Sequence, residues 1–179
     1  MPITWRLSAE SLLRAARALE PIVEADRKAL ADPTRDPPEE SIRAGVGSIH
    51  MMLIGMAIEN LAKALFVAAN PALRDPDRLA RELQTHTLVE FLEQGQLEMD
   101  EQDWFLCERL ETFVVWAGRY PVPTKLENYL PRQHPAGGSS PLTFTSSEDR
   151  ARIDRLVEQL TRLAIQEVEL EDSDDLPTA

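Results

Sequence analysis

Two short patterns in the sequence hold side chains that could do chemistry. The segment RELQTH places Arg81 and His86 with four residues between them. A histidine titrates near neutral pH, so His86 could accept the proton of a ribose 2′-hydroxyl while the guanidinium of Arg81 lies over the phosphate. These two groups could cleave RNA without a metal ion. The structural alternative is that His86 only forms hydrogen bonds at the approach to the helix that follows it.

Glu59 and Lys63 form the second pattern. They stand four positions apart with the acid first, which is the favourable order for an ion pair along a helix. Their neighbours are largely apolar, so we expect both charged heads to be partly buried, and buried charges need partners. Arg119 is a natural third member because its guanidinium can bind a carboxylate through two N–H groups. The pattern favours a structural network, and a ligand pocket near Glu59 is the alternative.

Arg119 and Tyr120 stand between the glycine that ends an apolar helical run and the first proline of a Pro-x-Pro pair. Gly118 lets the helix end, a cation near its carbonyl end is favoured by the helix dipole, and Pro121 prevents continuation. We therefore expect these two side chains to clamp a helix end to the rest of the fold. A base-stacking surface around Tyr120 is the functional alternative.

The sequence offers no pattern for a cofactor or a metal ion. The three histidines lie far apart, and the single cysteine, Cys107, can form neither an internal disulfide nor a Cys-x-x-Cys pair. No glycine-rich phosphate loop joins a strand to a helix, and the Gly-x-Ser-x-Gly motif of many hydrolases is missing. We expect neither a cofactor nor a bound metal.

Composition and charge limit the cellular setting and the partners. The chain has 179 residues, of which 43% are hydrophobic, enough for one domain with a core. It shows neither a leader pattern nor an uncharged apolar run of roughly 20 residues, so we expect a cytoplasmic protein without a membrane span. The formal net charge of −12 disfavours RNA or DNA as a partner, because phosphates must be neutralised by cations.

Helical spacing of apolar residues governs the first half of the chain. It predicts a helix over about 8–30, which begins at the N-cap Ser8 and in which Pro21 should produce a kink. A longer helix is expected over about 39–70; it is apolar on most sides and should be the central helix of a bundle. A short helical segment follows over about 77–83. Three glycines of the long helix either allow close helix contact or are merely tolerated: Gly45, Gly47 and Gly55.

Capping signals mark the helices of the second half. Thr87 and Glu90 have the spacing of a capping box for a short helix, and Gly95 suits its far end. Asp100 or Asp103 opens the helix that ends at Gly118. Helical spacing of apolar residues returns after Ser146 for the last helix.

The segment between the last two helices is rich in Pro, Gly, Ser and Thr, so residues 122–146 are expected to form a long irregular loop. The segment 171–179 is expected to be an acidic, disordered tail. Strand alternation is limited to the brief stretch PLTFTS. The sequence thus predicts one all-α domain over 1–170, a four- to five-helix up-and-down bundle with a long irregular loop before its last helix.

Three segments together resemble the HEPN family (higher eukaryotes and prokaryotes nucleotide-binding) of small helical bundles. They are GMAIENLAKALF (55–66), HTLVEFLEQG (86–95) and WAGRYPVP (116–123). The resemblance rests on Glu and Lys one turn apart, a His that opens a short helix, and a late Arg-Tyr-Pro. It spans about 41–123, and the outer helices fit only as generic helices.

The resemblance implies a bundle that dimerises through helix faces. Many family members are ribonucleases, and others are non-catalytic partners in toxin–antitoxin, defence or RNA-processing systems, often beside a nucleotidyltransferase. Catalytic members carry an Arg followed four to six residues later by His on a late helix. Here the matching arginine is Arg119, and Pro123, Thr124 and Lys125 stand at those distances.

The absence of a histidine four to six residues after Arg119 decides which function we expect. We expect a non-catalytic HEPN-like interaction or regulatory protein, a homodimer with a protein partner such as a nucleotidyltransferase. The alternative is a metal-independent endoribonuclease that uses Arg81 and His86, although this pair precedes the short helix instead of lying on the late one. The polar framework that the resemblance picks out is Glu59, Lys63, His86, Arg119 and Tyr120.

Overall fold

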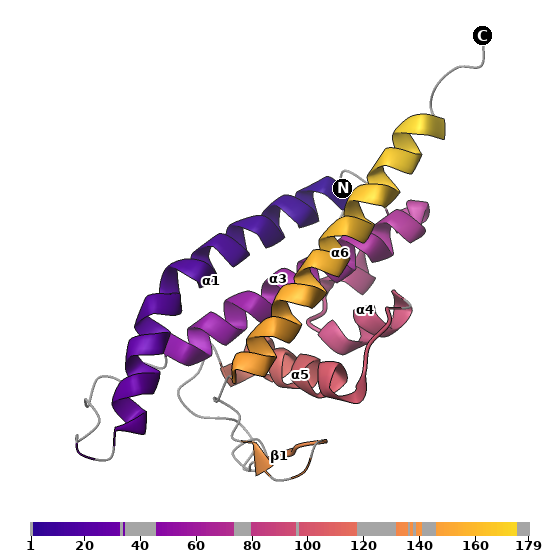
Figure 1. Cartoon of the computed structure of the whole chain (residues 1–179). Coiled ribbons are helices and arrows are strands. Elements are labelled where there is room, and N and C mark those ends of the chain that lie inside the picture. The colour runs from indigo at the N-terminus through magenta and orange to yellow at the C-terminus, as the bar shows by residue number, and fades with distance from the viewer. Residues whose placement is uncertain are drawn as a thin grey trace.

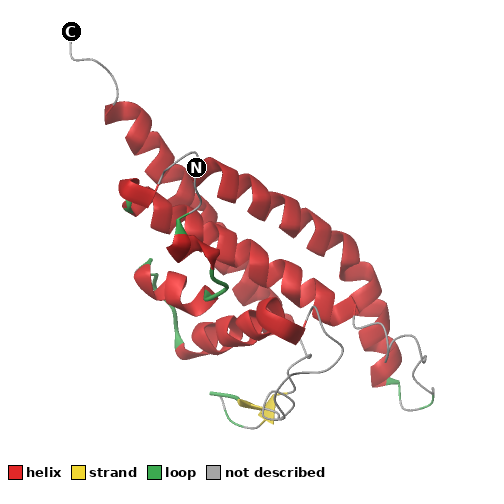
Figure 2. Ribbon diagram, turned by 180° about the vertical axis from the view of Figure 1, so that it is seen from behind, coloured by secondary structure: helices red, strands yellow, loops and turns green. Residues whose placement is uncertain are grey.

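The computed structural model of the protein describes residues 2–32, 34, 46–73, 80–95, 97–117, 132–135, 137, 139–140 and 146–174. This part of the chain is almost entirely helical (Figure 2). The predicted all-α bundle is therefore confirmed. In both views α1 and the pair α4–α5 lie on opposite sides of α3, while α6 crosses over them (Figure 1).

The described part of the chain contains five α-helices, three short helical turns and two short strands. The α-helices are α1 (Pro2–Ala31), α3 (Val46–Ala69), α4 (Leu88–Gln94), α5 (Glu101–Thr112) and α6 (Ser147–Asp174). The 3₁₀ turns η1 (Pro71–Leu73) and η2 (Arg81–Gln84) lie between α3 and α4, and the π-helical turn η3 (Phe113–Ala117) continues α5. A small antiparallel ladder pairs β1 (Arg132–Gln133) with β2 (Ser139–Ser140).

The central position belongs to α3, as its apolar composition predicted. It packs against α1, α4, α5 and α6, because apolar side chains on most of its sides need neighbours. One of the described helices, α3 itself, is long and apolar enough to cross a bilayer, yet most of it is buried inside the bundle. A central bundle helix is apolar on most sides because other helices surround it, just as a membrane-spanning helix is apolar because lipid surrounds it.

The first helix begins earlier than predicted. Pro2 suits the first helical turn, where its missing N–H leaves no bond unmade, and the helix runs on to Ala31. Ser8 is therefore not an N-cap; its Oγ accepts a hydrogen bond of 3.0 Å from the side-chain amide of Asn60 on α3. Pro21 lies inside the helix, and the ribbon of α1 bends in its second half (Figure 1).

The start of α4 corrects a second capping prediction. Thr87 is the N-cap, but its side chain makes no capping hydrogen bond and instead lies 3.1 Å from the hydroxyl of Thr85. The free N–H of Val89 donates to the carboxylate of Glu111 on α5 at 2.9 Å. Glu111 of the neighbouring helix thus accepts a first-turn N–H in place of the side chain of Thr87.

The starts of α5 and α6 follow the predicted local rules. Asp100 accepts a hydrogen bond from the N–H of Asp103 at 2.8 Å, and the carboxylate of Asp103 accepts the N–H of Asp100 at 3.2 Å. Ser146 and Asp149 exchange the same two bonds at 3.0 and 2.9 Å. Both helices therefore begin where the sequence predicted.

Several predicted boundaries move or lie beyond what the structure describes. The helix α6 continues through Asp174, into the segment 171–179 predicted as a disordered tail. The predicted loop contains the β1–β2 ladder, whose turn uses Gly137 at φ +95°. Outside the described residues lie 39–45 and 77–79 of two predicted helices, the helix end at Gly118 and all of PLTFTS except its last residue.

Close helix contact explains one of the three glycines of the long helix. A Cβ placed on Gly55 would lie 2.7 Å from Cγ2 of Val114 and 3.0 Å from the carbonyl oxygen of Leu110. At Gly47 no atom lies within 4 Å of such a Cβ, so that glycine is tolerated without a packing reason. Gly45 lies outside the described residues.

Candidate functional site

An ion pair is buried on α3 at the centre of the bundle. Glu59 and Lys63 project from successive turns, and the side chain of each is only 3% exposed. The ammonium of Lys63 donates to Oε1 of Glu59 at 2.6 Å. Their spacing of four residues therefore gives the intrahelical pair expected from the sequence, in a buried setting where each charge depends on the other.

Lys63 has further partners from three other segments. Its Nζ also donates to the backbone carbonyl of Thr85 at 2.7 Å, in the connection that leads to α4. The ring of Trp5 on α1 lies 5.3 Å from Nζ, and the ring of Phe91 on α4 lies 5.2 Å from it. Aromatic faces attract cations, most strongly where water is excluded. The ammonium is thus enclosed by the groups it needs.

His86 binds the same carboxylate nearer the surface. Its Nδ1 lies 3.2 and 3.3 Å from the two oxygens of Glu59. A carboxylate oxygen only accepts, so Nδ1 carries the hydrogen in this contact. The imidazole is 44% exposed, whereas Glu59 is 3% exposed. The carboxylate therefore links a buried cation to a ring at the surface. We call Trp5, Glu59, Lys63, Thr85, His86 and Phe91 the Glu59 cluster.

The structure thus brings together three of the five framework residues selected from the sequence: Glu59, Lys63 and His86. The remaining two, Arg119 and Tyr120, lie outside the described residues, so the expected contact between Arg119 and Glu59 and the expected helix-end clamp lie there too. Within the described residues, Glu59 is shared between one ammonium and one imidazole.

The alternative catalytic pair lies at the surface beside this cluster. Arg81 opens η2 and His86 follows that turn, and both residues are exposed. Arg81 forms no ion pair with any described residue. His86 is oriented through Nδ1 by a buried carboxylate, an arrangement that fixes which ring nitrogen carries the hydrogen. This orientation is the one feature of the site that a general base would use.

The two other histidines have separate surroundings. The ring of His134 packs edge to face against Phe105, with 5.1 Å between ring centroids. His50 on α3 is 6% exposed, and neither of its ring nitrogens has a hydrogen-bond partner among the described residues. Burial lowers the pKa of His50, Glu20 on α1 opposes that effect, and Arg150 on α6 adds to it.

A second buried ion pair was not predicted from the sequence. Arg109 on α5 is 1% exposed, and its Nη1 donates to Oδ2 of Asp149 at 3.3 Å, while its guanidinium lies 5.8 Å from the ring of Phe105. The helical periodicity of the sequence indicates that Arg109 is buried. Arg109 stands four residues from both Phe105 and Phe113, on the apolar stripe of its helix, where a cation must find a partner inside the fold.

A partly buried ionic network joins the start of α5 to α6. Nη1 of Arg152 donates to Asp100 and to Asp103 at 2.8 Å, and Arg155 donates to Asp103 at 2.6 Å. The hydrogen bond from Arg152 lowers the pKa of Asp100. The capping role of these acids was predicted locally, but their arginine partners lie about fifty positions further along the chain, beyond any local pattern.

The single thiol and the acidic side chains do not form a reactive centre. Cys107 is buried, and desolvation raises the pKa of its thiol to about 12, so it stays protonated at neutral pH. Over the described ranges no three His, Cys, Asp or Glu residues are grouped so as to hold a metal ion.

Two of the grooves on the described surface border α6. One lies between α1 and α6 with a volume of about 580 Å³, and the other lies between the start of α5 and α6 with about 690 Å³. At the Glu59 cluster, packing encloses the charged groups of Glu59 and Lys63, whose side chains are each 3% exposed. The chain matches no protein-family model, no curated protein and no solved structure.

Proposed function

We propose that this chain is a non-catalytic, HEPN-like interaction or regulatory protein of the cytoplasm that acts as a homodimer. It would belong to a toxin–antitoxin, defence or RNA-processing system, with a protein partner such as a nucleotidyltransferase. The proposal combines the resemblance of three sequence segments with the missing histidine after Arg119. No cofactor or metal enters the proposal.

The observation that carries the proposal is the burial of Glu59 and Lys63. A catalytic or ligand-binding charge must reach its substrate, yet these side chains are each 3% exposed and bind each other at 2.6 Å. A second N–H of the ammonium donates to the carbonyl of Thr85 at 2.7 Å. Such contacts support a structural role for the framework, since these charges neutralise one another inside the fold.

The charge of the chain supports a protein partner over a nucleic acid. With 19 basic and 31 acidic residues, the chain carries a formal charge of −12. Binding to a phosphate backbone gains affinity by releasing counterions from cationic contacts, and an acidic surface provides few of them. RNA is therefore the less favoured partner.

Incubation of labelled single-stranded RNA with the purified protein in a chelating buffer tests the absence of catalysis. We expect the RNA to remain intact with the wild type and with His86→Ala. Degradation by the wild type that disappears in His86→Ala but persists in a matched His134→Ala variant would contradict the proposal, because that difference assigns the cleavage to this site.

A second candidate function is a metal-independent endoribonuclease, favoured by the carboxylate that orients His86. In this scheme His86 takes the proton of the 2′-hydroxyl, the 2′-oxygen attacks phosphorus, and the bond to the 5′-oxygen breaks. Water protonates the leaving 5′-oxygen, and the products are a 2′,3′-cyclic phosphate and a 5′-hydroxyl. Arg81 would stabilise the charge on the phosphate. Cyclic-phosphate products lost in both Arg81→Ala and His86→Ala would establish it.

The partner is tested through the genes beside this one. We expect a neighbouring reading frame to encode a nucleotidyltransferase, and the two proteins to copurify after co-expression when only one carries a tag. Separate elution of the two proteins at micromolar concentration would remove the nucleotidyltransferase from the proposal and leave the question of catalysis untouched.

A further inference from the structure

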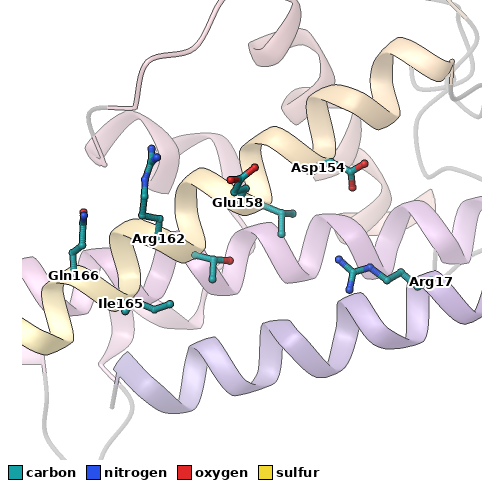
Figure 3. Close-up of a pocket in the computed structure, with 8 residues that line it drawn as sticks. Arg17, Asp154, Glu158, Arg162, Ile165 and Gln166 are labelled. Atoms are coloured by element: carbon teal, nitrogen blue, oxygen red, sulfur yellow. The ribbon is translucent and has the colours of Figure 1, made fainter.

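The groove between α1 and α6 is the feature on which this inference rests. Its volume is about 580 Å³. Arg17 on α1 lines it from one side, and its other lining residues belong to α6 (Figure 3). It runs along two long helices, since α6 spans 28 residues and α1 spans 30. At about 1.5 Å per residue, α6 is roughly 42 Å long, which offers room for a helix to lie alongside.

The charges around this groove balance one another. Arg17 and Arg162 contribute two positive charges, and Asp154 and Glu158 contribute two negative charges, so the groove is neutral. The whole chain has a formal charge of −12, which makes most faces of two copies repel each other. A neutral face is where a second copy meets the least repulsion.

These four charged side chains also lack partners in the described part of the chain. None of Arg17, Asp154, Glu158 and Arg162 makes an ion pair there, although their neighbours do. Other charged residues of α6 do form ion pairs. Arg150 pairs with Glu24 of α1 at 3.1 Å, and Arg152 pairs with Asp103 of α5 at 2.8 Å. The groove thus presents exposed charges of both signs that form no ion pair with a described residue and are available to a second molecule.

An uncharged row runs along α6 between these charges. Val157, Thr161 and Ile165 are spaced by four residues, so they follow one side of the helix, and Figure 3 shows Ile165 directed toward the gap above α1. Ile165 is 38% exposed, and Val157 and Thr161 are half-buried. Such a row, with a small residue between two apolar ones, can face an identical row that runs in the opposite direction.

We propose that this groove is the interface between two copies of the chain, related by a twofold axis that passes near Thr161. The inference rests on the homodimer named in the proposed function and assigns it a surface. Each α6 lies in the groove of the other copy, antiparallel to its counterpart, and a twofold interface needs this kind of self-complementary surface.

The register of this pairing follows from the axis at Thr161. Residues at equal distances on either side of 161 face each other, so Val157 of one copy lies opposite Ile165 of the second. Glu158 lies two positions, or about 3 Å along the helix, from the level of Arg162 of the second copy. The twofold axis repeats this contact, so each interface gains two pairs of opposite charge.

Charge reversal tests this register. We expect Glu158→Arg and Arg162→Glu each to weaken the dimer about tenfold or more, because each turns two attractive pairs into two repulsive ones. The double variant Glu158→Arg/Arg162→Glu exchanges the signs and should restore the dimer. Sedimentation equilibrium measures the dissociation constants. Arg81→Glu makes the same change in charge on an exposed turn and serves as the matched control.

A cross-link provides an independent measurement. Thr161→Cys places a thiol close to the proposed axis, so mild oxidation should convert most of this variant into a disulfide-linked dimer. Native Cys107 is buried and gives no background. Glu93→Cys, on the exposed side of α4, is the control and should remain monomeric on a denaturing gel.

The outcomes separate this inference from the proposed function. Rescue by the charge exchange together with the Thr161→Cys cross-link supports the interface. A stable dimer that none of these changes affects overturns the interface and leaves the homodimer standing. A monomer at all concentrations up to the high micromolar range overturns both the interface and the homodimer, while the RNA assay still decides separately whether the chain is catalytic.

Discussion

Lys63 shows how a single charged residue can be stable inside an apolar bundle. Its ammonium is held by the Glu59 carboxylate at 2.6 Å and by the Thr85 carbonyl at 2.7 Å, and two aromatic rings lie just over 5 Å away. These contacts offset the loss of hydration that burial of the ammonium costs. The same contacts join α1, α3 and the start of α4, so one residue organises three segments.

His50 makes the stability of the fold depend on pH. Burial lowers its pKa below the ordinary value of 6.5, so the folded state holds it neutral while the unfolded state takes up a proton as the pH falls through 6.5. Stability from this residue is therefore complete above about pH 6.5 and is lost toward lower pH. Uptake of this one proton changes the free energy of unfolding by at most about 1.4 kcal/mol per pH unit.

Thermal melts between pH 8 and pH 5 check this prediction. We expect His50→Leu to lose less melting temperature on acidification than the wild type, because the variant has no buried imidazole to charge. His134→Leu should follow the wild-type curve. Identical acid sensitivity of His50→Leu and the wild type would show that the ring is accommodated when charged.

Cys107 should be chemically inert in the folded protein. Its thiol is buried, and a pKa of about 12 leaves almost no thiolate at pH 8. We expect a thiol-reactive chromophore to label it at least 100-fold more slowly in the native protein than in urea, an estimate that follows from the small thiolate fraction. Rapid labelling of the native protein would mean that α5 opens locally.

At the scale of elements, the contact between α3 and the end of α5 depends on Gly55. A Cβ there would lie 2.7 Å from Cγ2 of Val114 and 3.0 Å from the backbone oxygen of Leu110, which cannot rotate away. Gly55→Ala should therefore lower the free energy of unfolding by about 1–3 kcal/mol, even though alanine favours a helix.

Gly47 supplies the control for this prediction on the same helix. No atom lies within 4 Å of a Cβ added there, so Gly47→Ala should leave stability unchanged or raise it by up to about 1 kcal/mol. Urea denaturation of both variants provides the comparison. Effects of the same sign and size at both positions would show that close packing at Gly55 is not what keeps that glycine.

The elements also show which structural features a sequence can predict. The caps at Asp100 and Ser146 were predictable because both partners of each capping box lie within four positions of one another. The cap of α4 was not, because the N–H of Val89 is satisfied by Glu111 from 22 positions away. Hydrogen-bond partners a few positions apart can be predicted from the sequence, whereas partners brought together by tertiary packing cannot.

In the candidate site, too, some contacts could be predicted from the sequence and others could not. The pairing of Glu59 with Lys63 follows from helical spacing, but the approach of Trp5 and the Thr85 carbonyl depends on how α1 and the α4 connection pack. Arg109 was detectable as a cation on an apolar stripe, yet its partner Asp149 lies 40 positions away. Periodicity identifies which charges are buried, and packing decides what neutralises them.

At the scale of the whole molecule, ionic contacts link helices that are distant in sequence. The Glu59 cluster joins α1, α3 and α4, the Arg109–Asp149 pair joins α5 to α6, and Arg152 joins the start of α5 to α6. These contacts leave the groove between α1 and α6 as a place where charges stay unpaired within the described surface. The interior is thus neutralised within one chain, and the groove is available to a second copy.

The central claim is that the buried charges of the Glu59 cluster are one another's counterions and maintain the fold. A double-mutant cycle with Glu59→Gln, Lys63→Met and the double variant, followed by urea denaturation, tests it most directly. We expect Lys63→Met alone to cost about 3–5 kcal/mol, because it leaves a buried carboxylate uncompensated. The double variant should cost clearly less than the sum of the single ones.

The exposed pair Arg6–Glu10, with the same spacing and a distance of 3.0 Å, provides the reference cycle. Its coupling should be a few tenths of a kcal/mol, as is usual for pairs at the surface. We predict a coupling between Glu59 and Lys63 of more than about 1 kcal/mol. A value no larger than that of Arg6 and Glu10 would contradict the account.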